Sequence, residues 1–265
     1  MRQLSNSQKK LIRSLSMKKT RLAEKLFLAE GDKMVRELIT HQRGQPGKRF
    51  SIASVIATDA WIEANRHLVD EDLELYLTTA SELEQISRQH APNQAMAIVH
   101  QYEPDLEIFQ LKTELSIGLE YLQDPGNMGS IIRLADWFGI DHILCSEDCV
   151  ELYNPKTIQS SMGSFLRVNV YYTDLKAQIR LLKKEEKFMV YGTSQNGSNL
   201  FHTPLFQPGI ILLGNEANGL SAGIIGLANR ILTIPYHDRI SRPESLNVAT
   251  AAAIIFAEFR RGHSK

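Results

Sequence analysis

Apolar runs alternate with segments of helical periodicity through the second part of the chain. Expected strands are Leu115–Leu122, His142–Cys145, Val168–Tyr172, Phe188–Gly192, Ile210–Leu213 and Ile231–Ile234. Expected helices are Met128–Phe138, Pro155–Ser161, Asp174–Glu186, Ser221–Leu227 and Ser245–Arg260. Apolar strands separated by helices are typical of a parallel sheet that helices cover on both faces. The pattern therefore predicts an α/β fold with a mostly parallel sheet.

The first part of the chain shows a shorter alternation of the same kind. Expected strands are Leu26–Ala29, Phe50–Ala57, Leu73–Leu77 and Ala95–His100, and expected helices are Asp32–Thr40, Asp59–Arg66 and Ser81–Gln89. The alternation lapses around Glu103–Lys112, where Pro104 falls. We therefore expect a basic N-terminal extension over residues 1–20, a small α/β domain over 21–105, and a second domain over 112–265.

Chain length and charge indicate a two-domain protein with a locally basic N-terminal segment. The 265 residues suffice for two domains, and 30 basic residues balance 30 acidic ones. Residues 1–25 depart from this balance, with eight basic residues and one acidic residue, Glu24. Such a segment attracts a polyanion locally, although an ordinary solvated helix gives the same pattern.

The sequence favours neither a membrane protein nor a metal protein. No apolar run reaches the ~18 residues of a membrane span, and the basic N-terminus lacks the apolar core of a secretory signal. Cys145 and Cys149 have no neighbouring cluster of Cys or His, which fits neither a zinc site nor a disulfide framework. We expect two reduced packing residues, no metal, and a cytoplasmic location.

Two polar segments follow expected strands in the second domain. Asp124–Arg133 (D-P-G-N-M-G-S-I-I-R) opens a helix with glycines, a natural site for a phosphate or ribose oxygen that Arg133 could also hold. An ordinary N-cap by Asn127 is the alternative. Gly214–Ser221 (G-N-E-A-N-G-L-S) lacks both the lysine of a P-loop and the dinucleotide fingerprint. A nucleoside on its glycine backbone, or a tight turn capped by Ser221, fits this segment.

A third segment closes the chain. Ile234-Pro235 ends a strand, and Ser245-Leu246-Asn247-Val248 opens a helix that is apolar on nearly all sides. Ser245 is the expected N-cap, and a helix without a polar stripe is buried in a core or in a subunit interface. A core helix alone leaves the polar Ser245 and Asn247 unexplained.

The three segments together resemble the SpoU family of S-adenosylmethionine-dependent RNA ribose 2′-O-methyltransferases, within the SPOUT superfamily. The resemblance covers residues 115–262, and the segment from Asn154 to Ser164 resembles the stretch between the family's first two motifs. Residues 20–100 more loosely resemble the substrate-binding domain that often precedes the catalytic one, which is similar to a small ribosomal-protein RNA-binding fold.

The resemblance implies a trefoil knot and a bent S-adenosylmethionine held among three loops. The cofactor-binding positions it implies are Thr193, Gly214, Asn215, Gly219, Ile234 and Leu246. The catalytic positions it implies are Arg133, Asn127, Glu216, Ser245 and Asn247. It also implies a homodimer formed through the C-terminal helix region.

These residues have different expected roles. A ribose hydroxyl is a poor nucleophile, so a base or an orienting group must act on its proton. The family's base matches Arg133, but arginine stays protonated in proteins, so we expect it to position a phosphate and polarise the hydroxyl. Asn127 and Glu216 would hold the first two loops and the substrate ribose, while Ser245 and Asn247 would shape the active site.

One departure from the family concerns the loop Tyr236–Glu244, which is longer than usual and lacks glycine. This loop either alters the edge of the donor site or adds RNA contacts through Arg239 and Arg242. Within it, His237 and Asp238 are either an acid–base pair or solvated loop residues.

We expect an RNA 2′-O-methyltransferase, with large-subunit ribosomal RNA as first target and transfer RNA as second. The alternatives are a non-catalytic RNA-binding or ribosome-assembly factor and a small-molecule methyltransferase.

Overall fold

The chain divides into two compact units, which are not contiguous in sequence. The computed structural model describes residues 2–44, 49–70, 72–87, 89, 94–215, 217–236 and 245–261. Unit 1 runs to Glu103 and includes Tyr153–Leu166, and unit 2 comprises Pro104–Leu152 and the residues from Arg167 onward. The expected boundary near Pro104 lies at this division, but the expected division did not assign Tyr153–Leu166 to the first unit.

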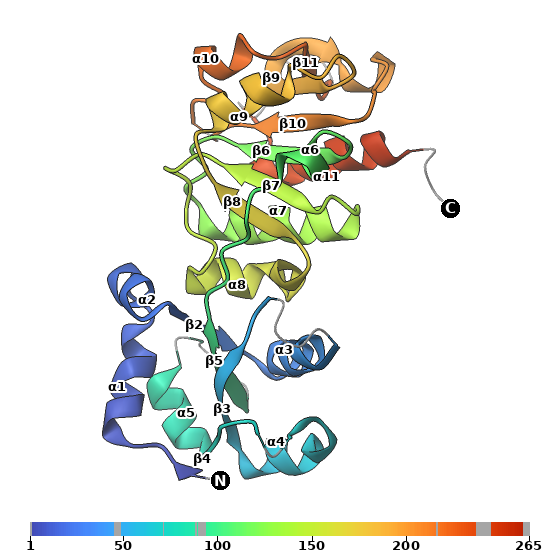
Figure 1. Ribbon diagram of the computed structural model, residues 1–265. Helices are drawn as coiled ribbons and strands as arrows, with labels where there is room; N and C mark the ends of the chain where they lie inside the picture. Colours follow the sequence, from blue (N-terminus) through green and yellow to red (C-terminus); the bar gives the residue numbers. More distant parts are fainter. Residues whose placement is uncertain are drawn as a thin grey trace. The chain divides into compact units, whose positions relative to one another are not determined.

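Unit 1 contains a mixed sheet with the strand order β1-β4-β3-β5-β2 (Figure 1). Its strands are β1 (Arg2–Gln3), β2 (Leu26–Glu30), β3 (Ile52–Thr58), β4 (Leu75–Thr78) and β5 (Ala95–His100). Its helices are α1 (Asn6–Ser14), α2 (Lys18–Glu24), α3 (Asp32–Gly44), α4 (Asp59–Ala64), α5 (Ala80–Ile86) and α8 (Pro155–Ser161), with short 3₁₀ turns at Arg66–Leu68 and Ser164–Leu166. β3 and β4 run parallel, whereas β5 is antiparallel to both β3 and β2.

The N-terminal residues belong to unit 1 and do not form a separate extension. Arg2 pairs with Tyr76 of β4. Ile12 of α1, with Leu15 just beyond the helix, is buried in a core that also contains Leu83 of α5. The expectation of an extension over residues 1–20 overlooked these apolar positions, which give the basic segment one buried side.

An aromatic cluster explains why Tyr153–Leu166 joins unit 1. The ring of Tyr153 lies 4.7 Å from that of Phe27, and the ring of Phe165 lies 5.2 Å from that of Phe50, between centroids. The Tyr153 hydroxyl also accepts a 2.8 Å hydrogen bond from the backbone N–H of Tyr102. Such buried aromatic pairs contribute about 1 kcal/mol each beyond the area they bury.

Unit 2 contains a sheet with the order β11-β9-β10-β6-β7-β8, and every pairing between these described strands is parallel. The strands are β6 (Leu115–Leu119), β7 (His142–Cys145), β8 (Asn169–Tyr172), β9 (Met189–Asn199), β10 (Gly209–Leu213) and β11 (Arg230–Thr233). The helices are α6 (Ile108–Leu111), α7 (Pro125–Trp137), α9 (Leu175–Leu182), α10 (Ala222–Ile225) and α11 (Val248–Arg260), with a 3₁₀ turn at Leu200–His202.

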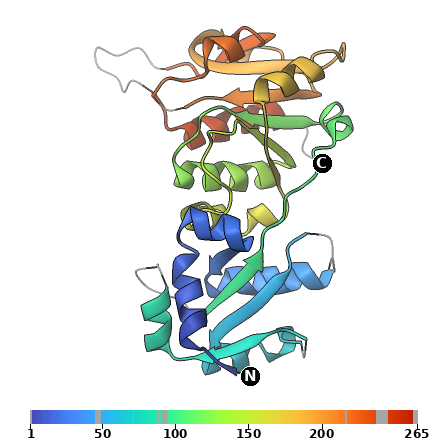
Figure 2. The ribbon, with the colours of Figure 1, turned by 60° about the vertical axis from the view of Figure 1, so that its left-hand side comes forward.

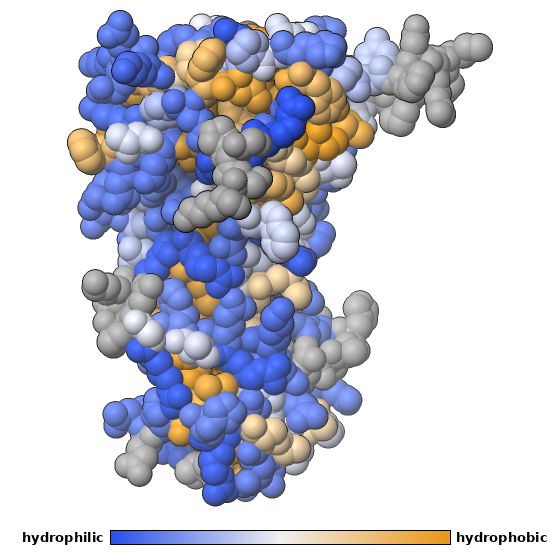
Figure 3. All heavy atoms as spheres, turned by 90° about the vertical axis from the view of Figure 1, so that its right-hand side faces the viewer, coloured by the Kyte–Doolittle hydropathy of each residue, from blue (hydrophilic) through white to orange (hydrophobic). Residues whose placement is uncertain are grey.

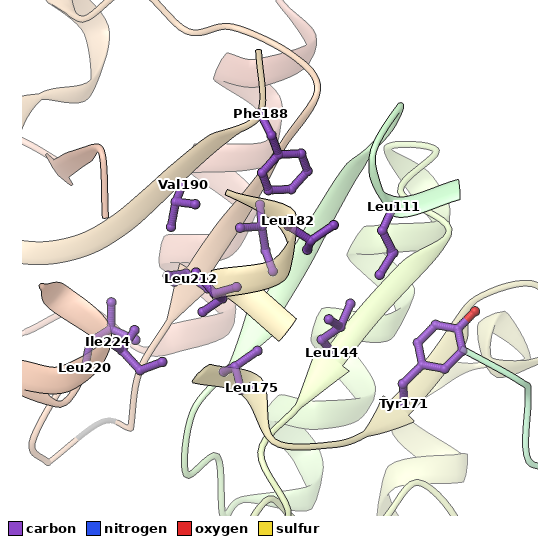
Figure 4. Packing of buried hydrophobic residues seen from close by; sticks show 12 residues of the cluster. Leu111, Leu144, Tyr171, Leu175, Leu182, Phe188, Val190, Leu212, Leu220 and Ile224 are labelled. Carbon is purple, nitrogen blue, oxygen red and sulfur yellow. The ribbon is translucent and has the colours of Figure 1, made fainter. Parts of the chain in front are cut away.

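Helices cover both faces of this sheet. On one face, Leu175 and Leu182 of α9 pack against Leu144 and Leu212 of the strands (Figure 4). On the other face, Phe259 of α11 packs edge-on against Tyr191 with 5.0 Å between ring centroids, and α11 lies beside α7 (Figure 2). The predicted α/β fold with a mostly parallel, doubly covered sheet is therefore confirmed, while the trefoil knot stays a prediction.

Among the elements whose bounds differ from the expected ones, β9 and α11 matter most for the site. β9 continues past Gly192 to Asn199, and its pairing with β11 skips from Gly192 to Ser198, so the intervening residues bulge out. A Cβ at Gly197 would lie 2.7 Å from the Ile231 carbonyl oxygen, so only glycine fits where the bulge rejoins the strand. α11 begins at Val248, three residues later than expected.

No described helix is both long and apolar enough to cross a membrane.

Candidate functional site

The three polar segments expected from the sequence converge on one edge of the unit 2 sheet. β10 lies between β6 and β9, while the chain leaves β6 in the opposite direction, toward β7. In a parallel sheet, the loops beyond the strands' carboxyl ends meet at such a switch point, where ligands bind. The loops after β6 and β10 are therefore neighbours.

The first loop follows β6 and leads into α7. Asp124 is the N-cap of α7, because its Oδ1 accepts a 2.8 Å hydrogen bond from the Asn127 N–H, and Pro125 follows in the first turn. The alternative of an N-cap by Asn127 is therefore wrong. The side chain of Asn127 is instead available for other partners.

The second loop follows β10 and turns back on itself. A Cβ at Gly214 would lie 2.2 Å from the backbone carbon of Gly219, so no other residue fits without moving the loop. Gly219 has a positive φ of 66° and donates its N–H to the Asn215 carbonyl at 2.8 Å. Glu216, the remaining predicted residue of this loop, lies outside the described residues.

Two interactions join the first loop to the second. The carboxylate of Glu120, only 3% exposed, accepts hydrogen bonds from the backbone N–H and the hydroxyl of Ser221, both at 2.7 Å. The Asn215 side-chain amide donates to the Tyr121 carbonyl at 2.9 Å. Tyr121 has a positive φ of 56°, unusual for a bulky residue, and is 44% exposed. The two loops thus form one structure.

Sequence reasoning missed Glu120, although a signal was present. The expected strand Leu115–Leu122 placed this acidic residue inside an apolar run, where a charge is retained only if it finds a partner. The structure ends the strand at Leu119 and gives the carboxylate two donors on Ser221.

The third segment meets the first through a pair of asparagines. The Asn247 side-chain amide donates to the Asn127 side-chain oxygen at 2.9 Å. The Asn247 oxygen also accepts from the N–H groups of Ala249 and Thr250, so Asn247 caps α11. The prediction of Ser245 as N-cap is wrong. Ser245 and Leu246 are exposed beside this cap, and Ile234 is half-buried just beyond β11.

The remaining predicted positions lie at or near the same edge. Thr193 lies where the β9 bulge begins, and its hydroxyl donates to the Leu212 carbonyl at 2.8 Å. Thr193 therefore lies inside β9, whereas the expected strand stopped at Gly192, and it holds the bulge to β10. The side chain of Arg133, on the exposed side of α7, makes no hydrogen bond or ion pair with another described residue. Its planar, permanently charged guanidinium is thus available to an anionic ligand.

The comparison with known proteins assigns this arrangement to a family. Residues 114–257, more than half of the chain, match the model of the SpoU rRNA Methylase family. The chain belongs to the SpoU rRNA methylase family. Residues 6–97 match a second model, described as an MRM3-like substrate binding domain. The predicted family and class of enzyme are confirmed.

Individual relatives agree with this assignment. The SpoU methylase is 28% identical over 249 residues to the 23S rRNA (guanosine(2553)-2′-O)-methyltransferase RlmP of Bacillus subtilis, a match that covers 94% of each chain. It is 30% identical over 156 residues to the tRNA (guanosine(18)-2′-O)-methyltransferase of Thermus thermophilus, covering 57% of this chain and 77% of the relative.

Solved structures show the same fold over the whole chain. A protein described as an RNA methyltransferase of the TrmH family from Porphyromonas gingivalis is 34% identical, with a TM-score of 0.81 and coverage of 97% of this chain and 98% of that one. An AdoMet-bound rRNA methyltransferase from Sinorhizobium meliloti is 24% identical, with a TM-score of 0.82 and coverage of 100% and 98%.

Two buried cysteines lie beneath the first loop of the SpoU methylase. The Cys149 sulfur accepts a hydrogen bond from the Leu122 N–H at 3.3 Å, and both Cys149 and Cys145 are free thiols. Hydrogen bonding from Cys145, with further help from Ser146, lowers the pKa of Cys149 to about 7. Burial raises the pKa of Cys145. Among the described residues, no group of three or more potential metal ligands is found.

Proposed function

We propose that this SpoU methylase transfers a methyl group from S-adenosylmethionine to a ribose 2′-hydroxyl of 23S-type ribosomal RNA, in the cytoplasm. The observation that carries the proposal is the junction of three loops at one sheet edge, closed by the hydrogen bond between Asn127 and Asn247. Ribosomal RNA is preferred over transfer RNA because the match to the 23S rRNA enzyme covers nearly the whole chain, including unit 1.

The residues at this edge suit the methyl donor. The close approach of Gly214 to Gly219 leaves backbone groups uncovered by side chains, which a nucleoside can contact. We assign binding of the adenosine part to the backbone at Gly214, Ile234 and Leu246, with Thr193, Asn215 and Gly219 shaping the loop. When bound, S-adenosylmethionine supplies a methyl group on a positively charged sulfur, which a nucleophile can attack directly.

Arg133 acts on the RNA side of the reaction. Methyl transfer forms an oxygen–carbon bond, breaks the sulfur–carbon bond and releases the hydroxyl proton to solvent. An arginine does not accept that proton, since its guanidinium stays protonated in proteins. Arg133 therefore holds the adjacent phosphate and orients the hydroxyl. Asn127 and Glu216 hold the ribose, while Ser245 and Asn247 complete the wall of the site.

We further propose that the enzyme is a homodimer formed through α7 and α11. The two helices run parallel: Asn247 bonds to Asn127 at one end, and Arg260 Nε donates to the Phe138 carbonyl at 2.8 Å at the other. Trp137 on α7 is 84% exposed, and hydrophobic residues gather on the face of unit 2 that Figure 3 presents. Sedimentation equilibrium should show a dimer for the wild type and a monomer for Trp137→Glu.

Two measurements test the proposed activity. Mapping of 2′-O-methyl groups in ribosomal and transfer RNA, with and without the gene, should reveal one 23S rRNA position that loses its methyl group. Calorimetry should show binding of S-adenosylhomocysteine to the purified protein. Absence of both the lost methyl group and this binding would favour the non-catalytic RNA-binding or ribosome-assembly factor.

A further inference from the structure

Unit 1 carries a hollow between two of its helices, separate from the site on unit 2. The hollow has a volume of about 520 Å³ and is lined by Asn6, Lys9, Lys10, Arg13 and Gln85. The first four residues lie on α1 and the last on α5, and these helices lie beside each other in both ribbon views (Figures 1 and 2).

The sequence of α1 explains why this side is polar. Ile12, together with Leu15 just beyond the helix, is buried against the sheet. Asn6, Lys10 and Arg13 recur at intervals of four and three residues, so they form a row along the helix. The row faces away from the core and remains open to solvent, with all three residues exposed.

The charges in the hollow do not cancel. Lys9 is paired with Glu82 at 2.6 Å, so one of the three cations is neutralised. The Lys10 side chain makes no hydrogen bond or ion pair with another described residue. Arg13 donates its Nε–H to the Gln85 carbonyl at 3.1 Å, which fixes the guanidinium plane. The remaining four N–H groups of that guanidinium are available to a ligand.

This set of groups fits the backbone of a nucleic acid. A Lys and an Arg one helical turn apart are about 5–6 Å from each other at Cβ, so they can contact phosphates of a single strand. The amides of Asn6 and Gln85, exposed at the rim, offer donors and acceptors to ribose hydroxyls, which distinguish RNA from DNA.

We propose that the α1–α5 hollow binds the phosphate backbone of the substrate RNA, at nucleotides other than the one that is methylated. This inference rests on the proposed function, since it names the surface by which the same RNA is held. Contacts to phosphates position a nucleic acid without reading its sequence. The hollow therefore contributes to RNA affinity and to its salt dependence, and leaves the rate of methyl transfer unchanged.

The test compares charge reversals on two helices of unit 1. Lys10→Glu combined with Arg13→Glu changes the hollow, and Lys33→Glu on α3 is the control because Lys33 is exposed and does not line the hollow. The RNA is unmodified 23S rRNA transcribed in vitro, and the readouts are KM for RNA, kcat at saturating RNA and the slope of log K against log salt. A Lys10→Ala, Arg13→Ala double variant serves if the charge reversal impairs folding.

The double variant should raise KM for RNA about tenfold or more, reduce the salt slope by about 2, and keep kcat and S-adenosylhomocysteine affinity at wild-type values. A KM and salt slope equal to those of Lys33→Glu would overturn the inference while the wild type still methylates RNA. A wild-type enzyme that methylates no RNA would instead overturn the proposed function, and direct RNA binding in a filter assay would still test the hollow.

Discussion

The two units both pair a sheet with helices, but they offer ligands different kinds of surface. In unit 2 all described strands run parallel, so their carboxyl ends collect the loops at one edge. Buried partners such as Glu120 hold these loops in place. In unit 1 antiparallel pairs send loops to both edges, and the cations lie on the outside of α1. Strand direction thus distinguishes the edge of unit 2, where we propose the cofactor site, from the solvated face of unit 1, where we propose the RNA surface.

The largest effect should follow Arg133→Ala in unit 2. If the guanidinium orients the hydroxyl as we propose, its loss should lower kcat about a hundredfold or more, while S-adenosylhomocysteine binding stays the same. Arg180→Ala, an exposed arginine on α9, is the matched control. Methylation within a few-fold of wild type would show that Arg133 neither orients nor activates the hydroxyl.

Gly214→Ala in unit 2 should weaken S-adenosylmethionine binding, because the backbone of the second loop is closely packed at this position. The new methyl group would overlap the backbone of Gly219, so the second loop must shift, and S-adenosylmethionine affinity should fall about tenfold or more. In unit 1, a Cβ at Gly44 meets nothing within 4 Å, so Gly44→Ala should leave affinity unchanged. Calorimetry on both variants measures the contrast, and equal affinities would argue against a cofactor on this loop.

Glu120→Ala should show that polar groups in unit 2 contribute more stability than those in unit 1. It leaves two donors on Ser221 without their carboxylate and should cost about 2 kcal/mol of unfolding free energy. Glu103→Ala in unit 1 removes an exposed ion pair with Lys25 and should cost less than about 1 kcal/mol. Urea unfolding measures both, and comparable losses would contradict the distinction between the units.

Asn247 allows two functions of one side chain to be separated. Asn247→Asp keeps the acceptor that caps α11 but removes the donor to Asn127, so stability should change little while methylation falls. Asn247→Ala removes both and should also cost about 1 kcal/mol of unfolding free energy. If Asn247→Asp methylates RNA at the wild-type rate, the asparagine pair does not support the site.

The smallest effect concerns pH. Because the pKa of Cys149 is lowered to about 7, its thiolate contributes stability above the unfolded pKa near 9, and that contribution is lost as pH falls through 7. The alkylation rate of Cys149 by iodoacetamide should therefore rise through pH 7 and then level off. Both cysteines of the chain lie in unit 2, so the reaction reports on the first loop alone. A midpoint near 9, measured in Cys145→Ser and in wild type alike, would contradict this assignment.

Local patterns predicted most elements but few of their connections. His142–Cys145 and Pro155–Ser161 have the expected bounds, since apolar runs and a proline start are local signals. The bond between Glu120 and Ser221 joins residues far apart in sequence, and no periodicity encodes it. Ser245 and Asn247 are equally good N-caps by residue type, so only the contact with Asn127 selects between them.

The insertion of Tyr153–Leu166 into unit 1 has a consequence for synthesis on the ribosome. When the first 103 residues have emerged, the aromatic rings of Phe27 and Phe50 still lack their partners Tyr153 and Phe165. The N-terminal unit therefore cannot complete its folding before part of the second unit has been translated. Such a chain departs from the usual order in which an N-terminal domain folds first. A nascent fragment ending at Glu103 should accordingly be more sensitive to protease than one that extends past Leu166.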